Sequence, residues 1–371
     1  MYKTQQIRLT ESISDAAWDY LVWHLRQSNS LQNCVTFAIR QAHFERMEPA
    51  TWYDHCGNCR SGHKLSRVRA NYRELAAQFK TNPHYQAIGG QQAQQAIKSV
   101  CESFASYNKL LPLWFAGELD VKPEMPGYRK SGGLSELSIP AQALRWDLAS
   151  GCCRLPISNE CRSDWQDIGA ELWLPGGDGF DPMTVAELRI VPRNGELYAE
   201  YVYQSGNAGP TCNLDLAHQQ ALGVDHGLGN WLTCVTTTGK SFIIDGHRLK
   251  SQNQWYNKRV AILKKGKPEA YWDDNLASLT EKRNRQMRDA VNKAARFVVN
   301  WCLQNRVGRI VFGWNPRQKD GLNIGKRNTQ SFVQIPTARL KQRLKELCEE
   351  VGIQFEEVEE SYTSQASFLS Q

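Results

Sequence analysis

The order of segments in the second half of the sequence limits the fold more than any other feature. Three short strand-like runs, LGVDHGL, WLTCVTTT and SFIIDG, follow one another from residue 222, with glycine-containing turns between them. A basic stretch of helical character covers about residues 248–305 and leads to the β-branched run RIVFGW. A helix opened by Pro336 and a last strand in IQFEEVE complete the series. Because apolar spacing distinguishes helices from strands, the sequence predicts the order β-β-β-α-β-α-β.

This order is typical of the RNase H-like fold, which RuvC-type nucleases and many transposases share. Its chemistry uses carboxylates at strand ends to hold two divalent metals, because Mg²⁺ prefers oxygen ligands. Asp225, between Gly223 and Gly227, is the expected first ligand. The simpler interpretation is an aspartate at a turn or strand end. The fourth strand ends in GWN (313–315) and supplies no acid.

Four glutamates follow the start of the fifth strand, at Glu356, Glu357, Glu359 and Glu360. They can supply a second ligand, or they can simply be the solvated end of a strand. No acid follows Glu360, so we expect no third ligand and no hydrolytic metal pair, with at most one weakly bound Mg²⁺. His55, Cys56, Cys59 and His63 look like half of a zinc site, but a single CxxC pair is a weak signal and we expect no zinc.

The first half predicts an α+β arrangement. Residues 2–9 alternate as a strand, residues 14–44 have helical spacing, and residues 49–70 are basic and irregular. In AELRIVPRNGELYAEYVYQ, Asn194-Gly195 separates two alternating runs, which is a strong hairpin signal. We therefore predict a β-rich domain over 1–10 and 113–218, an inserted helical domain over 11–112, and a third domain over 219–371.

Charge and its distribution favour a polyanionic partner. The 371 residues carry a net charge of +7, yet residues 248–296 alone hold thirteen lysines and arginines against five acids. A solvated basic face is the simpler interpretation of that helix. The predicted nucleic-acid contacts are Arg60, Lys64, Arg67, Arg69, Tyr72, Lys258, Arg259, Lys282, Arg285, Lys293, Arg296, Lys319, Lys326 and Arg327. Tyr72, with Tyr53, is a candidate for base stacking.

The start of the chain, MYKTQQIRLTES, has no apolar core of a secretion signal, and no run is long enough to span a membrane. Eleven cysteines without such a signal are expected to be free thiols in a reducing compartment. We therefore expect a cytoplasmic, nucleoid-associated bacterial protein.

Several stretches resemble the TnpB family, the RNA-guided nucleases of IS200/IS605 transposons that are related to type V CRISPR effectors. LGVDHGLGNWLTCV resembles the first RuvC motif of that family. The block NIGKRNTQSFVQIPTARLKQRLKELCEEVGIQFEEVEESYTSQASF is similar to the late block of one subgroup. The first half agrees in SLQNCVTFAIRQ, YQAIGGQQAQQAIKSVCESFASY and GELDVKPEMPGYRK.

The resemblance implies a split β-barrel wedge domain with an inserted helical recognition lobe, followed by a RuvC-like domain. It maps the second active-site acid to Glu360. The zinc ribbon and the final helix with the third aspartate, which the family carries, are missing here, Asn292 replaces a frequent histidine, and NPRQKDG departs from the family pattern. The chain therefore also resembles TnpB-like nuclease-dead repressors, although retention of Asp225 departs from them.

The resulting hypothesis is an RNA-guided, nuclease-dead DNA-binding protein that represses transcription by forming an R-loop. Its expected partners are one guide RNA per protein and double-stranded target DNA with a short flanking motif. The alternative is an active RNA-guided endonuclease that uses Asp225 and Glu360. A third interpretation is a decayed transposon remnant.

Overall fold

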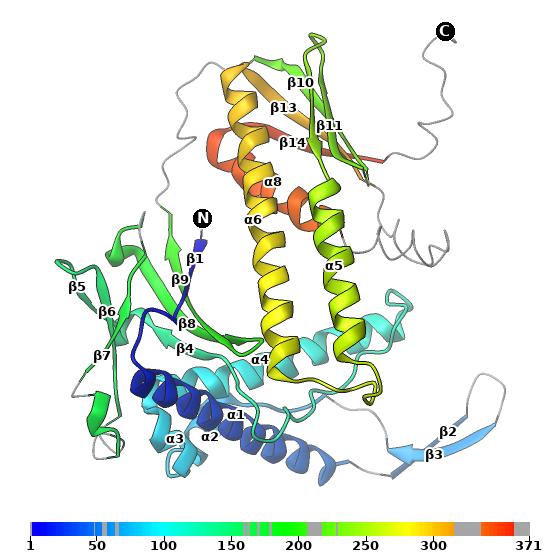
Figure 1. The fold of residues 1–371 in the computed structure, drawn as a ribbon. Coiled ribbons are helices and arrows are strands. Elements are labelled where there is room, and N and C mark those ends of the chain that lie inside the picture. The colour runs from blue at the N-terminus through cyan, green and yellow to red at the C-terminus, as the bar shows by residue number, and fades with distance from the viewer. Residues whose placement is uncertain are drawn as a thin grey trace. The chain divides into compact units, whose positions relative to one another are not determined.

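The computed structural model describes residues 2–47, 49–53, 58–63, 67–158, 161, 164–168, 171–177, 180–205, 217–227, 229–314 and 335–359. The chain divides into two units, Met1–Gly206 and Asn207–Gln371. Both contain helices as well as strands (Figure 1), so the fold class is mixed α/β as predicted.

The strands of unit 1 form two antiparallel sheets. The first has the order β1-β9-β8-β4 and the second the order β5-β6-β7. Their bounds are β1 Tyr2–Arg8, β4 Leu137–Pro140, β5 Arg145–Asp147, β6 Cys152–Leu155, β7 Leu172–Pro175, β8 Val185–Arg193 and β9 Glu196–Gln204. The predicted hairpin is confirmed between β8 and β9, where Asn194 and Gly195 have φ angles of 49° and 80°. Among the described strands no pairing joins the two sheets, so a closed barrel stays a prediction.

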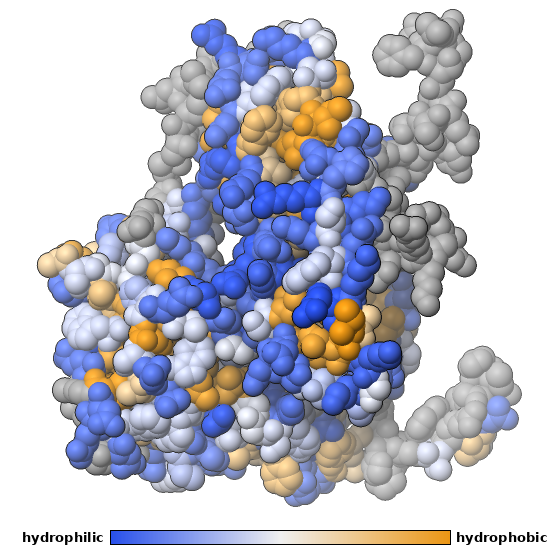
Figure 2. Space-filling model, viewed as in Figure 1, coloured by the Kyte–Doolittle hydropathy of each residue, from blue (hydrophilic) through white to orange (hydrophobic). Residues whose placement is uncertain are grey.

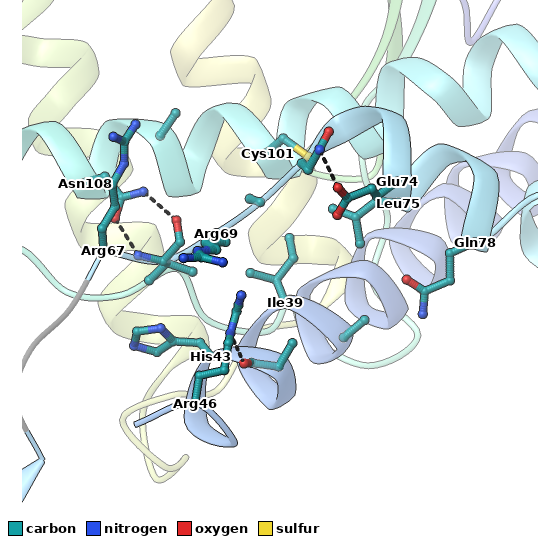
Figure 3. A pocket seen from close by; sticks show the side chains of 16 residues that line it. Ile39, His43, Arg46, Arg67, Arg69, Glu74, Leu75, Gln78, Cys101 and Asn108 are labelled. Atoms are coloured by element: carbon teal, nitrogen blue, oxygen red, sulfur yellow. Dashed lines mark hydrogen bonds between the residues drawn. The ribbon is translucent and has the colours of Figure 1, made fainter. Parts of the chain in front are cut away.

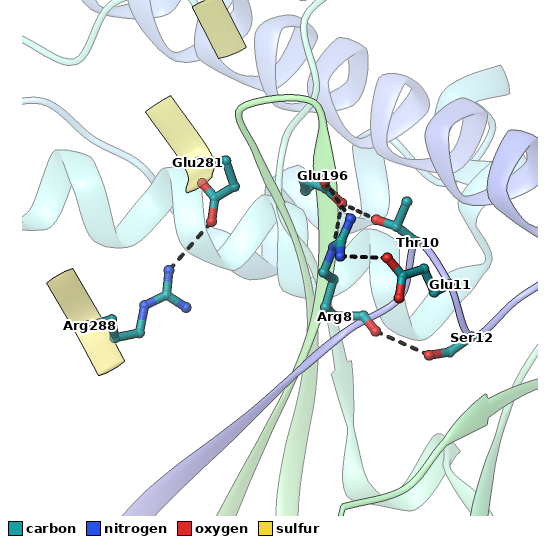
Figure 4. A network of polar contacts seen from close by, with 7 residues as sticks. All are labelled: Arg8, Thr10, Glu11, Ser12, Glu196, Glu281 and Arg288. Carbon is teal, nitrogen blue, oxygen red and sulfur yellow. Dashed lines mark hydrogen bonds and ion pairs between the residues drawn. The ribbon is translucent and has the colours of Figure 1, made fainter. Parts of the chain in front are cut away.

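The first strand pairs with a strand about half the chain away. Tyr2 lies opposite Gln204, and Arg8 lies opposite Tyr198. The Arg8 guanidinium fastens this pair because it donates to both carboxylate oxygens of Glu196, at 3.0 and 2.9 Å (Figure 4). A two-pronged contact of this kind fixes geometry better than a single hydrogen bond. The contact stabilises the pairing of β1 with β9.

Helix α1 (Asp15–Phe44) links two hydrophobic cores of unit 1. Its N-cap is Ser14, whose hydroxyl accepts a hydrogen bond from the backbone N–H of Ala17. The first turns of α1 pack among the strands through Tyr20, Leu21 and Leu25. Its later turns pack against α2 (Tyr72–Gln78), α3 (Pro83–Ile88) and α4 (Gly90–Phe115).

One expectation for unit 1 is wrong. The stretch predicted as irregular contains an antiparallel pair, β2 (Pro49–Tyr53) and β3 (Cys59–His63). The two strands are held by backbone pairing, and their sequences lack the apolar alternation that signals a half-buried strand.

Unit 2 is built on a five-stranded sheet with the order β12-β11-β10-β13-β14. The strands are β10 Ala217–His226, β11 Asn230–Thr236, β12 Ser241–Asp245, β13 Val307–Gly313 and β14 Gln354–Val358. β10, β13 and β14 run parallel, and β10, β11 and β12 are antiparallel neighbours. Every strand that the sequence predicts in this half is present.

The basic stretch predicted as one helical segment is two helices, α5 (His247–Leu263) and α6 (Asp274–Gln304). The break contains Gly266, with a φ of 72°, and Pro268, which cannot continue a helix. The apolar side chains of Met287, Val291 and Val298 on α6 are buried. The last helix, α8 (Thr337–Val351), follows Pro336 as predicted.

One face of this sheet forms the core of unit 2. Leu222 and Val224 of β10 and Phe312 of β13 are buried with Val298 of α6 and Leu344 of α8. Because side chains alternate along a strand, the residues next to these, including Asp225, project from the opposite face. The packing of α6 and α8 therefore determines on which face of the sheet the candidate catalytic aspartate lies.

Candidate nucleic-acid interface

Asp225 lies near the carboxyl end of β10 and is exposed. It is opposite Thr233 of β11, and the pairing of Val224 with Phe312 places Asp225 level with Gly313 of β13. Gly313 has no side chain, so space is left beside the carboxylate on that strand. The carboxyl ends of the three parallel strands share this edge of the sheet.

The two glycines around Asp225 have different roles. A Cβ on Gly227 would lie 2.8 Å from the carbonyl oxygen of Asn230, so the turn between β10 and β11 requires glycine. A Cβ on Gly223 would lie 3.6 Å from the carbonyl oxygen of Val235, which is an ordinary contact. Of these two glycines, only Gly227 is therefore required by the local backbone geometry.

Two of the predicted acids are paired within unit 2. Glu356 forms an ion pair with Arg309 of β13, and Glu357 forms an ion pair with Lys341 of α8. Both glutamates therefore have a structural explanation. Glu359 ends the described part of this segment, and Glu360 lies outside the described residues.

An aromatic group that the sequence analysis did not single out adjoins the paired acids. The Lys341 ammonium lies 4.4 Å from the centroid of the Trp314 ring, and the His226 ring meets Trp314 edge-on at 5.6 Å. The backbone N–H of Trp314 donates to the Val358 carbonyl at 2.9 Å, which continues the β13–β14 pairing by one residue. The parallel pairing of β10, β13 and β14 brings these residues together. Their spacing in the sequence does not predict this contact.

The described residues do not fit a divalent metal centre. Within them, no three histidine, cysteine, aspartate or glutamate side chains gather closely enough to hold an ion. Asp225 belongs to no such group, so the described residues give it no metal-dependent role. Of the half zinc site, Cys59 is exposed, while His55 and Cys56 lie outside the described residues.

The predicted basic residues of α5 and α6 lie mostly at the surface. Lys258, Arg259, Lys282 and Arg296 are exposed, and Arg285 is half-buried. Lys293 is exposed, but its ammonium is 2.8 Å from an Asp289 carboxylate oxygen. In the view of Figure 2, most of the surface over α5 and α6 is hydrophilic. These helices therefore offer several cations to phosphates.

Other charges on these helices are structural. The Arg283 Nε donates to the Asn253 side-chain oxygen at 2.9 Å, and the guanidinium lies 5.5 Å from the Tyr256 ring centroid, so it ties α6 to α5. Burial lowers the pKa of Arg283. The buried carboxylate of Glu281 lies 3.6 Å from Arg288 on the same helix (Figure 4).

Unit 1 brings two predicted cations into one recess. Arg67 and Arg69 line a cavity of about 1,020 Å³ together with Arg46, which the sequence analysis did not identify (Figure 3). Tyr72 is half-buried and packs against the helical core, which restricts its use for stacking. The side chain of Arg60, and Lys64, Lys319, Lys326 and Arg327, lie outside the described residues.

Residues 214–317, which span β10 to β13, match the model of the OrfB_IS605 family, described as a probable transposase. The match confirms the resemblance to the IS605-type TnpB family over this part of the chain. No curated protein sequence matches.

Two solved structures have a low similarity to the chain. A cryo-EM structure of a Cas12f1–sgRNA–target DNA complex is 14% identical, with a TM-score of 0.33, over 98% of this chain and 86% of that one. A CRISPR–Cas12f ternary complex is 13% identical, with a TM-score of 0.32, over 94% and 72% of the two chains. In the described part of the chain, no helix is long and apolar enough to cross a membrane.

Proposed function

We propose that the protein is an RNA-guided DNA-binding protein of the TnpB type, which opens its target as an R-loop and represses transcription without cutting. The single observation that carries RNA-guided binding is the match of residues 214–317 to the OrfB_IS605 transposase family. The strand order β12-β11-β10-β13-β14 supports a RuvC-like unit, because it keeps the first strand central between the second and the fourth.

The basic surface of α5 and α6 supports the same function. Exposed cations such as Lys258, Arg259 and Arg296 attract phosphates irrespective of base sequence. In RNA-guided recognition the protein holds the duplex by its backbone, and base pairing reads the sequence. One guide RNA and a double-stranded DNA target with a short flanking motif are therefore the proposed partners.

Two observations favour binding without cleavage. Strand β13 ends at Gly313, and the next two residues in the sequence are Trp314 and Asn315, so the residues that directly follow the strand carry no carboxylate. Glu356 and Glu357 are engaged by Arg309 and Lys341. Carboxylates that already face a cation are less available to a metal pair.

The second candidate function is RNA-guided DNA cleavage. It is favoured by the position of Asp225, which is exposed at the strand edge beside a glycine. This account needs further ligands from residues such as Glu360.

The test uses the full chain with the RNA that copurifies with it. Sequencing that RNA defines a matched DNA target, which is then labelled on both strands and incubated with the complex and Mg²⁺. Retardation of the matched DNA without strand breaks supports the proposal. Cleavage that disappears in Asp225→Ala supports the second candidate.

A further inference from the structure

The recess in unit 1 has the size of a site for one small ligand. It is bounded by α1, residues 67–71, α2 and α4 (Figure 3). Its volume of about 1,020 Å³ is at the upper end of ligand pockets, which span roughly 300–1,000 Å³. A cube of that volume is about 10 Å on a side. One major groove of B-form DNA alone is about 12 Å wide, so a double helix is wider than the recess. A single nucleotide fits this space, and a double helix does not.

The positive charge of the recess favours an anionic ligand. Arg46, Arg67 and Arg69 line it with one carboxylate, Glu74. Within the described residues, no carboxylate forms an ion pair with any of the three arginines. The Glu74 carboxylate accepts a hydrogen bond from the Asn71 amide at 2.7 Å. Figure 3 shows the Arg46 and Arg69 side chains pointing toward one another, an arrangement of like charges that a bound phosphate would stabilise.

The floor of the recess is apolar. Ile39 and Val68 are each 2% exposed, and Leu75 is 7% exposed. These side chains can cover the flat face of a base, while the Gln78 amide at the rim can donate to and accept from a base edge. Unpaired bases are commonly bound in this way, with an apolar contact to the ring and hydrogen bonds to its edge.

The wall that carries Arg67 and Arg69 is held in place before any ligand binds. The Asn108 amide on α4 donates to the Val68 carbonyl at 2.8 Å, and the Val68 N–H donates to the Asn108 side-chain oxygen at 3.0 Å. On the opposite wall, the Arg46 Nε donates to the Ala42 carbonyl at 2.7 Å. A site that is already ordered loses less entropy on binding.

We propose that this recess binds one unpaired nucleotide of a single-stranded nucleic acid. Arg46 and Arg69 hold its phosphate, and the base lies against Ile39 and Leu75. Guanidinium groups suit this role because they contact phosphate oxygens through two parallel hydrogen bonds. The inference rests on the proposed nucleic-acid binding. It adds that unit 1 binds a single-stranded nucleic acid through one unpaired nucleotide.

The test measures binding of short labelled probes to the full chain by fluorescence anisotropy. The probes are a single-stranded RNA tetranucleotide, the DNA tetranucleotide of the same sequence, and a 12-base-pair DNA duplex. Arg69→Ala is expected to weaken the preferred tetranucleotide about tenfold, the loss typical of one charged hydrogen-bonding partner. Whichever tetranucleotide binds the parent chain more tightly identifies the source of the nucleotide.

Arg73 provides a matched charge control. It is exposed on α2 and does not line the recess. Arg73→Ala removes the same charge, and the tetranucleotide affinity should stay within about twofold. If Arg69→Ala does not fold, as judged by circular dichroism, Arg46→Ala replaces it.

A second pair of variants tests occupancy without changing charge. Ala105 is exposed on α4 and lines the recess, and Ala77 is exposed on α2 outside it. Ala105→Phe should block the tetranucleotide, and Ala77→Phe should not. Equal losses in Arg69→Ala and Arg73→Ala, unchanged binding in Ala105→Phe, or the same dependence for the duplex would overturn the inference.

The failures of the two proposals are distinguishable. If the parent chain binds its copurified RNA but no tetranucleotide, the recess inference is wrong and the proposed function stands. If the parent chain binds neither, both are wrong.

Discussion

Arg309 on β13 and Glu356 on β14 form an ion pair between neighbouring parallel strands of unit 2. The two side chains are separated by 47 positions in the sequence, and each is about two-fifths exposed. The contact assigns a structural partner to a glutamate that the sequence presents as a candidate metal ligand. Its consequences can be measured.

Glu356→Gln should have a small effect on stability and none on nucleic-acid binding. Half-exposed ion pairs are screened by solvent, so the free energy of unfolding should fall by less than about 1 kcal/mol. Chemical denaturation followed by circular dichroism measures this change, with Arg309→Gln as the matched partner variant. A loss of Mg²⁺-dependent DNA cleavage in Glu356→Gln would show instead that this glutamate serves a catalytic site.

Lys258→Ala should weaken binding of the copurified RNA more than Lys293→Ala. Lys258 is exposed on α5, whereas the Lys293 ammonium on α6 is already 2.8 Å from Asp289. The logarithmic salt dependence of affinity should become shallower by about 0.7–0.9 for each phosphate contact that is lost. Filter binding at several salt concentrations measures that slope. Equal slopes in Lys258→Ala and the parent chain would remove Lys258 from the interface.

Acid should destabilise unit 1 through His24. Its ring is fully buried, its Nε2 lies 3.1 Å from the Ile88 carbonyl oxygen, and burial lowers its pKa to about 4. The unfolded chain binds this proton below a pKa of about 6.5, so stability falls as the pH drops from about 6.5 toward 4, by roughly 3 kcal/mol for one site.

Thermal unfolding between pH 7 and pH 4 measures the effect of His24. His24→Gln removes the titrating group, so its unfolding temperature should depend less on pH than that of the parent chain. His84→Gln is a comparison variant, because burial also lowers the pKa of the less buried His84. Identical pH profiles for His24→Gln and the parent chain would contradict this assignment.

Gly352→Ala should destabilise unit 2. Gly352 ends α8 with a φ of 80°, and its N–H donates to the Cys348 carbonyl. A side chain in this left-handed conformation costs roughly 1 kcal/mol. Denaturation midpoints measure the loss, and Gly352→Asn should recover part of it because asparagine tolerates this conformation. An unchanged midpoint in Gly352→Ala would contradict the expected strain.

The sequence predicted the strands of unit 2 because their apolar residues face one buried layer, as Leu222, Val224 and Phe312 do. The Asn194-Gly195 turn was predictable because it needs positive φ angles. β2 and β3 were not predicted, because backbone pairing alone leaves no apolar alternation to detect. A strand can be predicted from the sequence when its own residue pattern shows which of its side chains are buried.

The candidate site was less predictable than the fold. The sequence correctly placed Asp225 in the first strand of unit 2, but it did not show that Arg309 and Lys341 engage Glu356 and Glu357. It selected Arg67 and Arg69 from their charge, but not Arg46. That arginine follows α1 and joins the other two only through the packing of α1, α2 and α4. Contacts between distant segments depend on register and packing angle, which one sequence does not specify.

The central claim is that the protein binds a guide-matched DNA without cutting it. The most direct measurement incubates the RNA-bound full chain with matched and mismatched DNA in Mg²⁺ and resolves both complexes and strands on gels. The account predicts RNA-dependent retention of the matched DNA, intact strands, and the same retention with Asp225→Ala. Mg²⁺-dependent strand breaks that are lost in Asp225→Ala, or retention that does not depend on the RNA, would contradict it.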